Sequence, residues 1–273
     1  MEMLDINEEI AVKEVKVETK VKEETKVKEE TKEVTEMMQK KVLTEDLGKQ
    51  FEMGICILYG IDYDGKYKYT YSSAEALSVR MCKLKELFPY NIRHIAKNGS
   101  PYDFVREEGV EEVVNPVIPR YLSAKTTKKD GKVCPQVIGQ PSRKKFCEYF
   151  ALKAESTLED IKMYIEEPLG LKKLLHTYIQ HTFDCPVIYY NKHKNLLLFI
   201  QMKEQIDWDK YIDLIHFSHN VKKRKWNEST SISINKTTIG EFQVHNHRDC
   251  IKFRWAFEKI LTIFAENFDV VYI

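Results

Sequence analysis

The sequence lacks most of the short motifs that identify large enzyme classes. It has no GxGxxG, no GxxxxGK(S/T) and no GxSxG, so nothing supports a dinucleotide-binding, P-loop or α/β-hydrolase site. Its six cysteines form no CxxC pair, which argues against a zinc ribbon and favours reduced, mostly buried thiols. The longest strongly apolar run, Leu196 to Ile200, is too short to span a bilayer, and the acidic N-terminus has no apolar signal region. We therefore expect an intracellular, soluble protein with no membrane partner.

Charge and complexity divide the chain near residue 43. Residues 1–43 carry 9 lysines against 12 acidic residues, whereas 44–273 carry 34 basic and 30 acidic residues. Residues 13–36 are of low complexity, and VKEETK occurs at 21–26 and again at 27–32. This six-residue period matches neither a coiled coil nor an amphipathic helix. We predict a charged arm over 1–43, either disordered or a solvated helix, and one domain over 44–273.

The hydrophobic pattern of the body indicates a mixed α/β fold. Apolar stripes predict a helix from Thr44 to Tyr59, with Thr44 as its N-cap, and a second helix from Ser73 to Phe88. Short runs bounded by Gly and Pro between 99 and 139 suggest strands. Further helices are expected at 142–153 and 158–182 and after Trp255, and further strands at 186–190, 195–202 and 231–245.

A carboxylate and an amine occur in two neighbouring predicted strands. Asp103 in GSPYDFV ends a turn and opens a strand, and Lys125 in YLSAKT lies on a later one. Side by side, such strands bring the two groups to one end of a sheet. A carboxylate there can hold Mg²⁺, and the lysine can orient an attacking water or stabilise charge on a phosphate.

These residues resemble the PD-(D/E)XK nuclease superfamily, particularly its type II restriction endonucleases. Pro101-Tyr102-Asp103 stands for the first motif and Ser123-Ala124-Lys125 for the second. The resemblance implies a central mixed sheet flanked by helices and Mg²⁺-dependent hydrolysis of double-stranded DNA at specific sites. It also implies a homodimer, and a cognate DNA methyltransferase that acts on the same site.

The sequence departs from this pattern at Ser123, which occupies the place of the second acidic residue. The second metal carboxylate must then come from elsewhere, and Glu52, on the helix before the first motif, is the leading candidate; Glu241 is the other. The same departure favours the rival interpretation, a catalytically inactive nucleic-acid-binding protein on a nuclease-like fold. A third interpretation, an interaction protein, is favoured by the repeat in the arm.

A basic cluster surrounds the second motif. Residues 120–145 hold eight basic residues and one acid, which suits a phosphate backbone. Gln140 and Arg143 are expected to steady the scissile backbone, and the helix N-terminus after Ser142 is a candidate phosphate site. The predicted DNA-binding residues are Lys128, Lys129, Arg143, Lys144, Arg248 and Arg254.

A second candidate site lies in IGEFQVHNHRDCIKFRW, residues 239–255. Glu241 and Gln243 project from one strand face and resemble a Glu-x-Gln variant of the nuclease motif, with Glu228 as the upstream acid. His245 and His247 share a strand face and could chelate a metal, although polar histidines at strand ends are commoner. Asp184 with Lys203 is a third, weaker pair.

The basic run Lys222 to Trp226 remains open to two interpretations. It could be a DNA-facing loop with Trp226 available to stack, or a nuclear-localisation-like patch. The leading expectation is a cytoplasmic, Mg²⁺-dependent restriction-type endonuclease of a bacterium or a virus-infected cell, with Asp103, Lys125, Glu52 and Gln140 as its catalytic residues and with Asp103 and Glu52 as its metal ligands.

Overall fold

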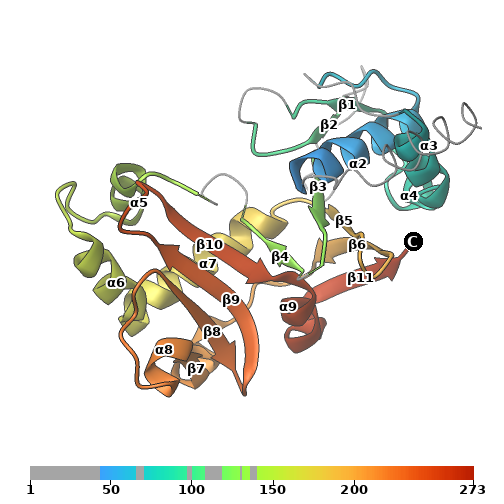
Figure 1. Ribbon diagram of the computed structural model, residues 1–273. Coiled ribbons are helices and arrows are strands. Elements are labelled where there is room, and N and C mark those ends of the chain that lie inside the picture. Colours follow the sequence, from blue (N-terminus) through green and yellow to red (C-terminus); the bar gives the residue numbers. More distant parts are fainter. Residues whose placement is uncertain (1–43, 66–70, 97–99, 108–118, 130, 136–139) are drawn as a thin grey trace, which may run out of the picture. The chain divides into compact units, whose positions relative to one another are not determined.

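The computed structural model describes residues 44–65, 71–96, 100–107, 119–129, 131–135 and 140–273 (Figure 1). Contacts between Cα atoms divide the chain into two units, Met1–Leu43 and Thr44–Ile273. The predicted charged arm, with its repeat, lies outside the described residues, so it stays a prediction.

A six-stranded sheet carries the first pair of motif residues. Its strand order is β1-β2-β3-β5-β6-β11, and the neighbouring strands are antiparallel except for the parallel pair β3 and β5 (Figure 1). The two motif strands are therefore adjacent, as the sequence predicts. The strands are β1 (Ile92–His94), β2 (Phe104–Arg106), β3 (Tyr121–Thr127), β5 (Val187–Asn191), β6 (Leu196–Met202) and β11 (Phe268–Tyr272).

Helix α2 (Thr44–Tyr59) packs on β3 and on α3 (Tyr71–Arg80). Leu47, Phe51 and Ile55 are buried on its apolar stripe, and the Phe51 ring stacks on Tyr190 of β5 with centroids 5.6 Å apart. The predicted helix bounds of 44–59 are confirmed, because an unbroken stripe with helical spacing is a strong local signal.

A second, five-stranded antiparallel sheet is built around aromatic side chains. Its strand order is β4-β10-β9-β8-β7, and Tyr178 of α7 stacks on Phe253 of β10 with ring centroids 4.6 Å apart. The indole nitrogen of Trp255 donates a hydrogen bond to the Thr182 hydroxyl at 3.1 Å, so this buried donor is satisfied. The strands are β4 (Lys132–Val133), β7 (Ile215–Phe217), β8 (Ser229–Ile234), β9 (Thr237–Val244) and β10 (Ile251–Ala256).

The remaining elements are short helices and the crossover between β3 and β5. Parallel strands require such a crossover, and helices α5 to α7 provide it together with β4. The helices are α4 (Leu84–Leu87), α5 (Arg143–Phe150), α6 (Leu158–Glu166), α7 (Pro168–Phe183), α8 (Ser218–Val221) and α9 (Phe257–Ile263), with the 3-10 helices η1 (Trp208–Lys210), η2 (Ile212–Leu214) and η3 (Ala265–Asn267).

Three predicted elements are divided in the structure. The 73–88 helix is interrupted at Met81–Lys83, where the Leu84 amide bonds to the Met81 carbonyl in a tight turn. The 158–182 helix is interrupted at Glu167, whose ψ of 130° is the extended conformation that a following proline favours. The 231–245 strand is the β8–β9 hairpin, which turns at Asn235 and Lys236 with positive φ at both residues.

Strands β1, β7, β10 and β11 are absent from the prediction. Strand β11 pairs with the distant β6 and follows the helix that was predicted as the last element. The mixed α/β class is confirmed, whereas the specific restriction-endonuclease-like architecture stays a prediction. In the part of the chain that the structure describes, no helix is long and apolar enough to cross a membrane.

We expect Gly240→Ala to destabilise the protein by about 1–3 kcal/mol, because overpacking a core displaces its neighbours. A Cβ at Gly240 would lie 2.6 Å from Cζ of the buried Phe253 and 3.2 Å from the Arg254 carbonyl oxygen. The matched control is Gly48→Ala on α2, where the nearest atom would be Thr126 Oγ1 at 3.7 Å, an ordinary contact. Urea unfolding measures both variants. Equal stabilities for the two would contradict the packing around Gly240.

Candidate active site and metal-binding residues

The β2–β3 pairing places Asp103 opposite Ser123. Phe104 pairs with Leu122 in the antiparallel register, so the residue before β2 lies beside the third residue of β3. The Asp103 carbonyl also accepts a hydrogen bond from the Ile95 amide at 2.9 Å, which extends the ladder to the residue after β1. Asp103 is thus fixed from both sides at the edge where the turn enters the strand.

The Asp103 carboxylate is held by two neutral donors and one amine. Its Oδ2 accepts hydrogen bonds from the Ser123 hydroxyl at 2.9 Å and the Ala124 amide at 2.7 Å, and Lys125 Nζ lies 3.5 Å away. The side chains of Asp103 and Lys125 are 16% and 18% exposed. Both therefore reach solvent, but the surrounding protein reduces the screening of their charges by water. All three contacts fall on Oδ2, and Oδ1 takes part in none of them.

Glu52 faces inward from α2, as its place beside Phe51 predicts, and it is 6% exposed. Its carboxylate lies 2.9 Å from Lys49 Nζ and 3.2 Å from Nε2 of the buried His94 on β1. The Asp64 amide donates a hydrogen bond to His94 Nδ1 at 3.3 Å, so Nδ1 is an acceptor. In a neutral imidazole the other nitrogen, Nε2, then carries the proton and donates the hydrogen bond to Glu52. His94 was not among the predicted site residues, because one histidine in a three-residue strand gives no local signal.

Glu52 lies on α2, which packs on β3, and Asp103 directly precedes β2, which pairs with β3. Together they offer oxygen ligands of the kind that Mg²⁺ prefers. They do not form a group of three or more ligands within 4.8 Å with His94 or another described residue.

Glu241 and Gln243 share one face of β9, as predicted, but two basic side chains lie beside Glu241. Glu241 Oε2 lies 2.7 Å from Lys132 Nζ and 3.6 Å from Arg254, while Gln243 donates to its Oε1 at 2.8 Å. Burial acts to raise the pKa of Glu241. The hydrogen bonds from Lys132 and Gln243 outweigh burial, so the pKa lies below its usual value and the carboxylate is ionised.

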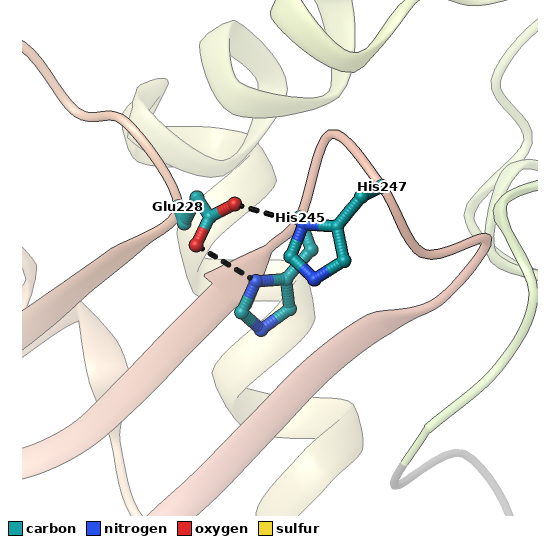
Figure 2. Close-up of side chains that lie close together, drawn as sticks. All are labelled: Glu228, His245 and His247. Atoms are coloured by element: carbon teal, nitrogen blue, oxygen red, sulfur yellow. Dashed lines mark hydrogen bonds and ion pairs between the residues drawn. The ribbon is translucent and has the colours of Figure 1, made fainter.

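Glu228, predicted as the upstream acid of this second site, contacts two histidines instead. His245 Nδ1 lies 3.3 Å from one Glu228 oxygen, and His247 Nδ1 lies 3.1 Å from the other; Figure 2 shows both rings beside the carboxylate. Among the described residues, these three form the one group of three or more potential metal ligands whose atoms all lie within 4.8 Å of one another. The HNH spacing in the sequence pointed to the histidine pair but not to its acidic partner.

The N-terminus of α5 is already occupied by side chains of the protein. Ser142 caps the helix by accepting a hydrogen bond from the Lys145 amide, as predicted, and Asp249 accepts one from the Arg143 amide at 3.3 Å. A phosphate would have to share this terminus with the Asp249 carboxylate. The residues predicted to contact the DNA backbone differ in exposure. Those that are exposed are Lys129, Gln140, Arg143, Lys144 and Arg248, and those that are half-buried are Lys128 and Arg254.

One minor prediction changes, and one residue of the third candidate pair has a partner in the structure. Trp226 is 4% exposed, and its ring lies among Phe217, His219 and Phe242, so it is not available to stack on a base. Asp184 accepts a hydrogen bond from the Tyr102 hydroxyl at 2.6 Å, which ties the turn after α7 to the turn before β2.

Comparison with known proteins adds one relative. The type II restriction enzyme CviAII of Paramecium bursaria Chlorella virus 1 is 43% identical to this chain over 230 residues. The aligned part covers 84% of this chain and 63% of that protein, so this chain spans less than two thirds of the relative's length. No protein-family model and no solved structure matches the chain. Over most of its length, the chain is similar to a restriction endonuclease.

We expect Cys56, one turn after Glu52 on α2, to resist alkylation in the folded protein. Burial, with the charges of Glu52 and Asp62, raises the pKa of its thiol to about 12, so the reactive thiolate is scarce at neutral pH. The exposed Cys82 is the internal control and reacts readily. Iodoacetamide labelling followed by peptide mass spectrometry measures both. Comparable labelling of the two thiols before unfolding would contradict the burial of the α2 face that carries Glu52.

Proposed function

We propose that this chain is a site-specific endonuclease of double-stranded DNA whose active site is built on Asp103 and Lys125. One observation carries the proposal: the two side chains lie 3.5 Å apart on adjacent strands, in a chain 43% identical over most of its length to a protein named a type II restriction enzyme. The placement agrees with the resemblance to the PD-(D/E)XK superfamily, which we propose as the wider family.

The donor set fits Mg²⁺ as the cofactor. Asp103 Oδ1 takes no part in the contacts that hold Oδ2, and Glu52 offers a second carboxylate from the neighbouring helix. Both are hard oxygen ligands, which match Mg²⁺ better than they match a soft metal. When bound, Mg²⁺ would supply the positive charge that polarises the phosphodiester.

The remaining residues would act on the water and on the DNA backbone. The Lys125 ammonium, held beside Asp103, would orient the attacking water and stabilise charge that develops on the phosphate. Ser123 and the Ala124 amide would keep Asp103 in one orientation, so that no reorganisation is needed during the reaction. The exposed side chains of Gln140 and Arg143 would contact the backbone near the scissile bond.

We propose further that the protein acts as a homodimer, so that two sites cut both strands, and that a DNA methyltransferase protects the same sites in the cell. Both follow from the resemblance and from the relative's name alone. A cytoplasmic location follows from the substrate in the same way.

The second candidate function is a nucleic-acid-binding protein without catalytic activity. Ser123 favours it, because a buried hydroxyl donates to Asp103 where the family pattern has a second carboxylate. The two functions differ in one requirement. A nuclease requires Asp103 and Lys125 for catalysis, whereas a binding protein requires them at most for contact with the nucleic acid.

We expect Asp103→Asn and Lys125→Ala each to lower the rate of DNA cleavage by about 10²-fold or more, because each removes a group that stabilises the transition state. Unmethylated phage DNA is incubated with Mg²⁺ and the products are separated on a gel. The matched controls are Asp213→Asn and Lys259→Ala, which change the same residue types at exposed positions and should leave discrete bands unchanged.

Two results would contradict the proposed site. If the wild type cuts and both site variants cut as fast, the active site lies elsewhere, and Glu241→Gln tests the second candidate. If the wild type does not cut but retains DNA in a salt-sensitive manner, the chain is the binder. Circular dichroism of each variant confirms that it is folded.

We expect the double variant Arg143→Ala/Lys144→Ala to weaken DNA binding and to reduce the slope of log K against log salt by about 2, because each lost phosphate contact lowers it by about 1. Binding is measured without Mg²⁺, in the Asp103→Asn background, so that cleavage does not interfere. Lys259→Ala is the charge control. An unchanged slope in the double variant would place the DNA on another face.

A further inference from the structure

We propose that Glu228, His245 and His247 form a binding site for a transition-metal ion of the Zn²⁺ class, distinct from the Asp103–Lys125 site. The two imidazole Nδ1 atoms lie 3.3 and 3.1 Å from the two carboxylate oxygens (Figure 2). Zn²⁺ binds such ligands at about 2.0–2.1 Å, so the edge of its tetrahedron is about 3.3 Å. One ligand atom from each of the three side chains lies within 4.8 Å of the other two, so a small closing movement would bring them to the spacing that one ion requires.

The pairing of β8 with β9 produces this arrangement. Ser229 pairs with Gln243, and the Val244 amide donates to the Glu228 carbonyl at 2.7 Å, so Glu228 lies beside the end of β9. His245 follows the buried Val244 and points to the opposite face. His247, two residues on, brings its ring to within 5.2 Å of the His245 ring, measured between centroids.

An ordinary hydrogen-bond network does not account for all three side chains. His247 Nδ1 is in hydrogen-bonding geometry with Glu228, but His245 Nδ1 is not, although this atom is buried and faces the carboxylate. A buried ring nitrogen without a hydrogen bond is costly. A cation between the three ligand atoms would satisfy it.

The ligand set selects the kind of ion. Two imidazoles and one carboxylate form a His₂Glu set, which suits Zn²⁺ and its transition-metal neighbours, whereas Mg²⁺ and Ca²⁺ prefer oxygen alone. His247 is 60% exposed, so a further coordination position would face solvent. Water or an anionic ligand such as a phosphate oxygen could occupy it.

Binding of the ion would fix the loop between β9 and β10, residues 245–250. At its far end the Ile251 amide donates to the Pro141 carbonyl at 2.9 Å, and Asp249 contacts the first turn of α5. The exposed Arg248 lies between these contacts and the two histidines. The ion would therefore hold one end of the segment that carries Arg248, and the contacts of Asp249 and Ile251 hold the other end.

The test uses the untagged full-length protein, freed of metal with a chelator and titrated with Co²⁺ as a spectroscopic probe. We expect one equivalent to bind with visible ligand-field bands and to be displaced by Zn²⁺. His245→Ala, His247→Ala and Glu228→Gln should each weaken Co²⁺ binding by about tenfold or more. The control is His216→Ala, an exposed histidine on β7, which should bind as the wild type does.

The proposal is overturned if the three ligand variants bind Co²⁺ as tightly as the wild type. It is also overturned if the bound Co²⁺ shows an intense near-ultraviolet thiolate band, because the ligands would then be cysteines. His247→Ala removes an exposed side chain, so it is the variant best able to keep the fold. Its far-ultraviolet circular dichroism and its melting temperature without metal should match those of the wild type.

Discussion

The parallel pairing of β3 with β5 is the constraint on which the candidate active site depends. The Ser123 amide bonds to the Pro186 carbonyl at 3.0 Å and the Lys192 amide to the Thr127 carbonyl at 2.9 Å, so β3 is fixed at both ends. Its other edge pairs with β2 and positions Asp103, and α2 packs on it and carries Glu52. A one-residue slip of β3 would turn Lys125 to the opposite face of the sheet. The register of this one strand therefore decides whether the acid and the amine meet.

Ser123 changes the electrostatics of the site as well as its ligand count. A carboxylate in its place would lie within hydrogen-bond distance of Asp103, and two like charges at that separation raise the pKa of one of them unless a cation intervenes. With serine, Asp103 is held by neutral donors and Lys125, so the site is stable without an ion. The cost is one fewer anionic ligand, so the proposed Mg²⁺ would depend more on a second carboxylate such as Glu52.

Local sequence patterns predicted the structural features that depend on neighbouring residues. They missed the contacts between residues that are far apart in the sequence. The α2 stripe, the Ser142 cap and the adjacency of the two motif strands follow from local spacing. The buried His94 beside Glu52 is 42 residues away from it, and Lys132 is 109 residues from its partner Glu241, so no local spacing reports either pair. Trp226 follows four basic residues and looked exposed, yet aromatic packing with Phe217 and Phe242 buries it.

Three carboxylates show how partners decide what an acid can bind. Glu241 is paired with Lys132 and Arg254, so a metal there would have to displace two positive charges that already neutralise it. Asp103 is held mainly by neutral donors and keeps Oδ1 out of those contacts, which suits a hard cation. Glu228 faces two imidazoles, whose nitrogen lone pairs favour a softer transition-metal ion over Mg²⁺. The three environments therefore differ in ligand chemistry: oxygen ligands at the proposed Mg²⁺ site, and two imidazoles with one carboxylate at the proposed site for a Zn²⁺-class ion.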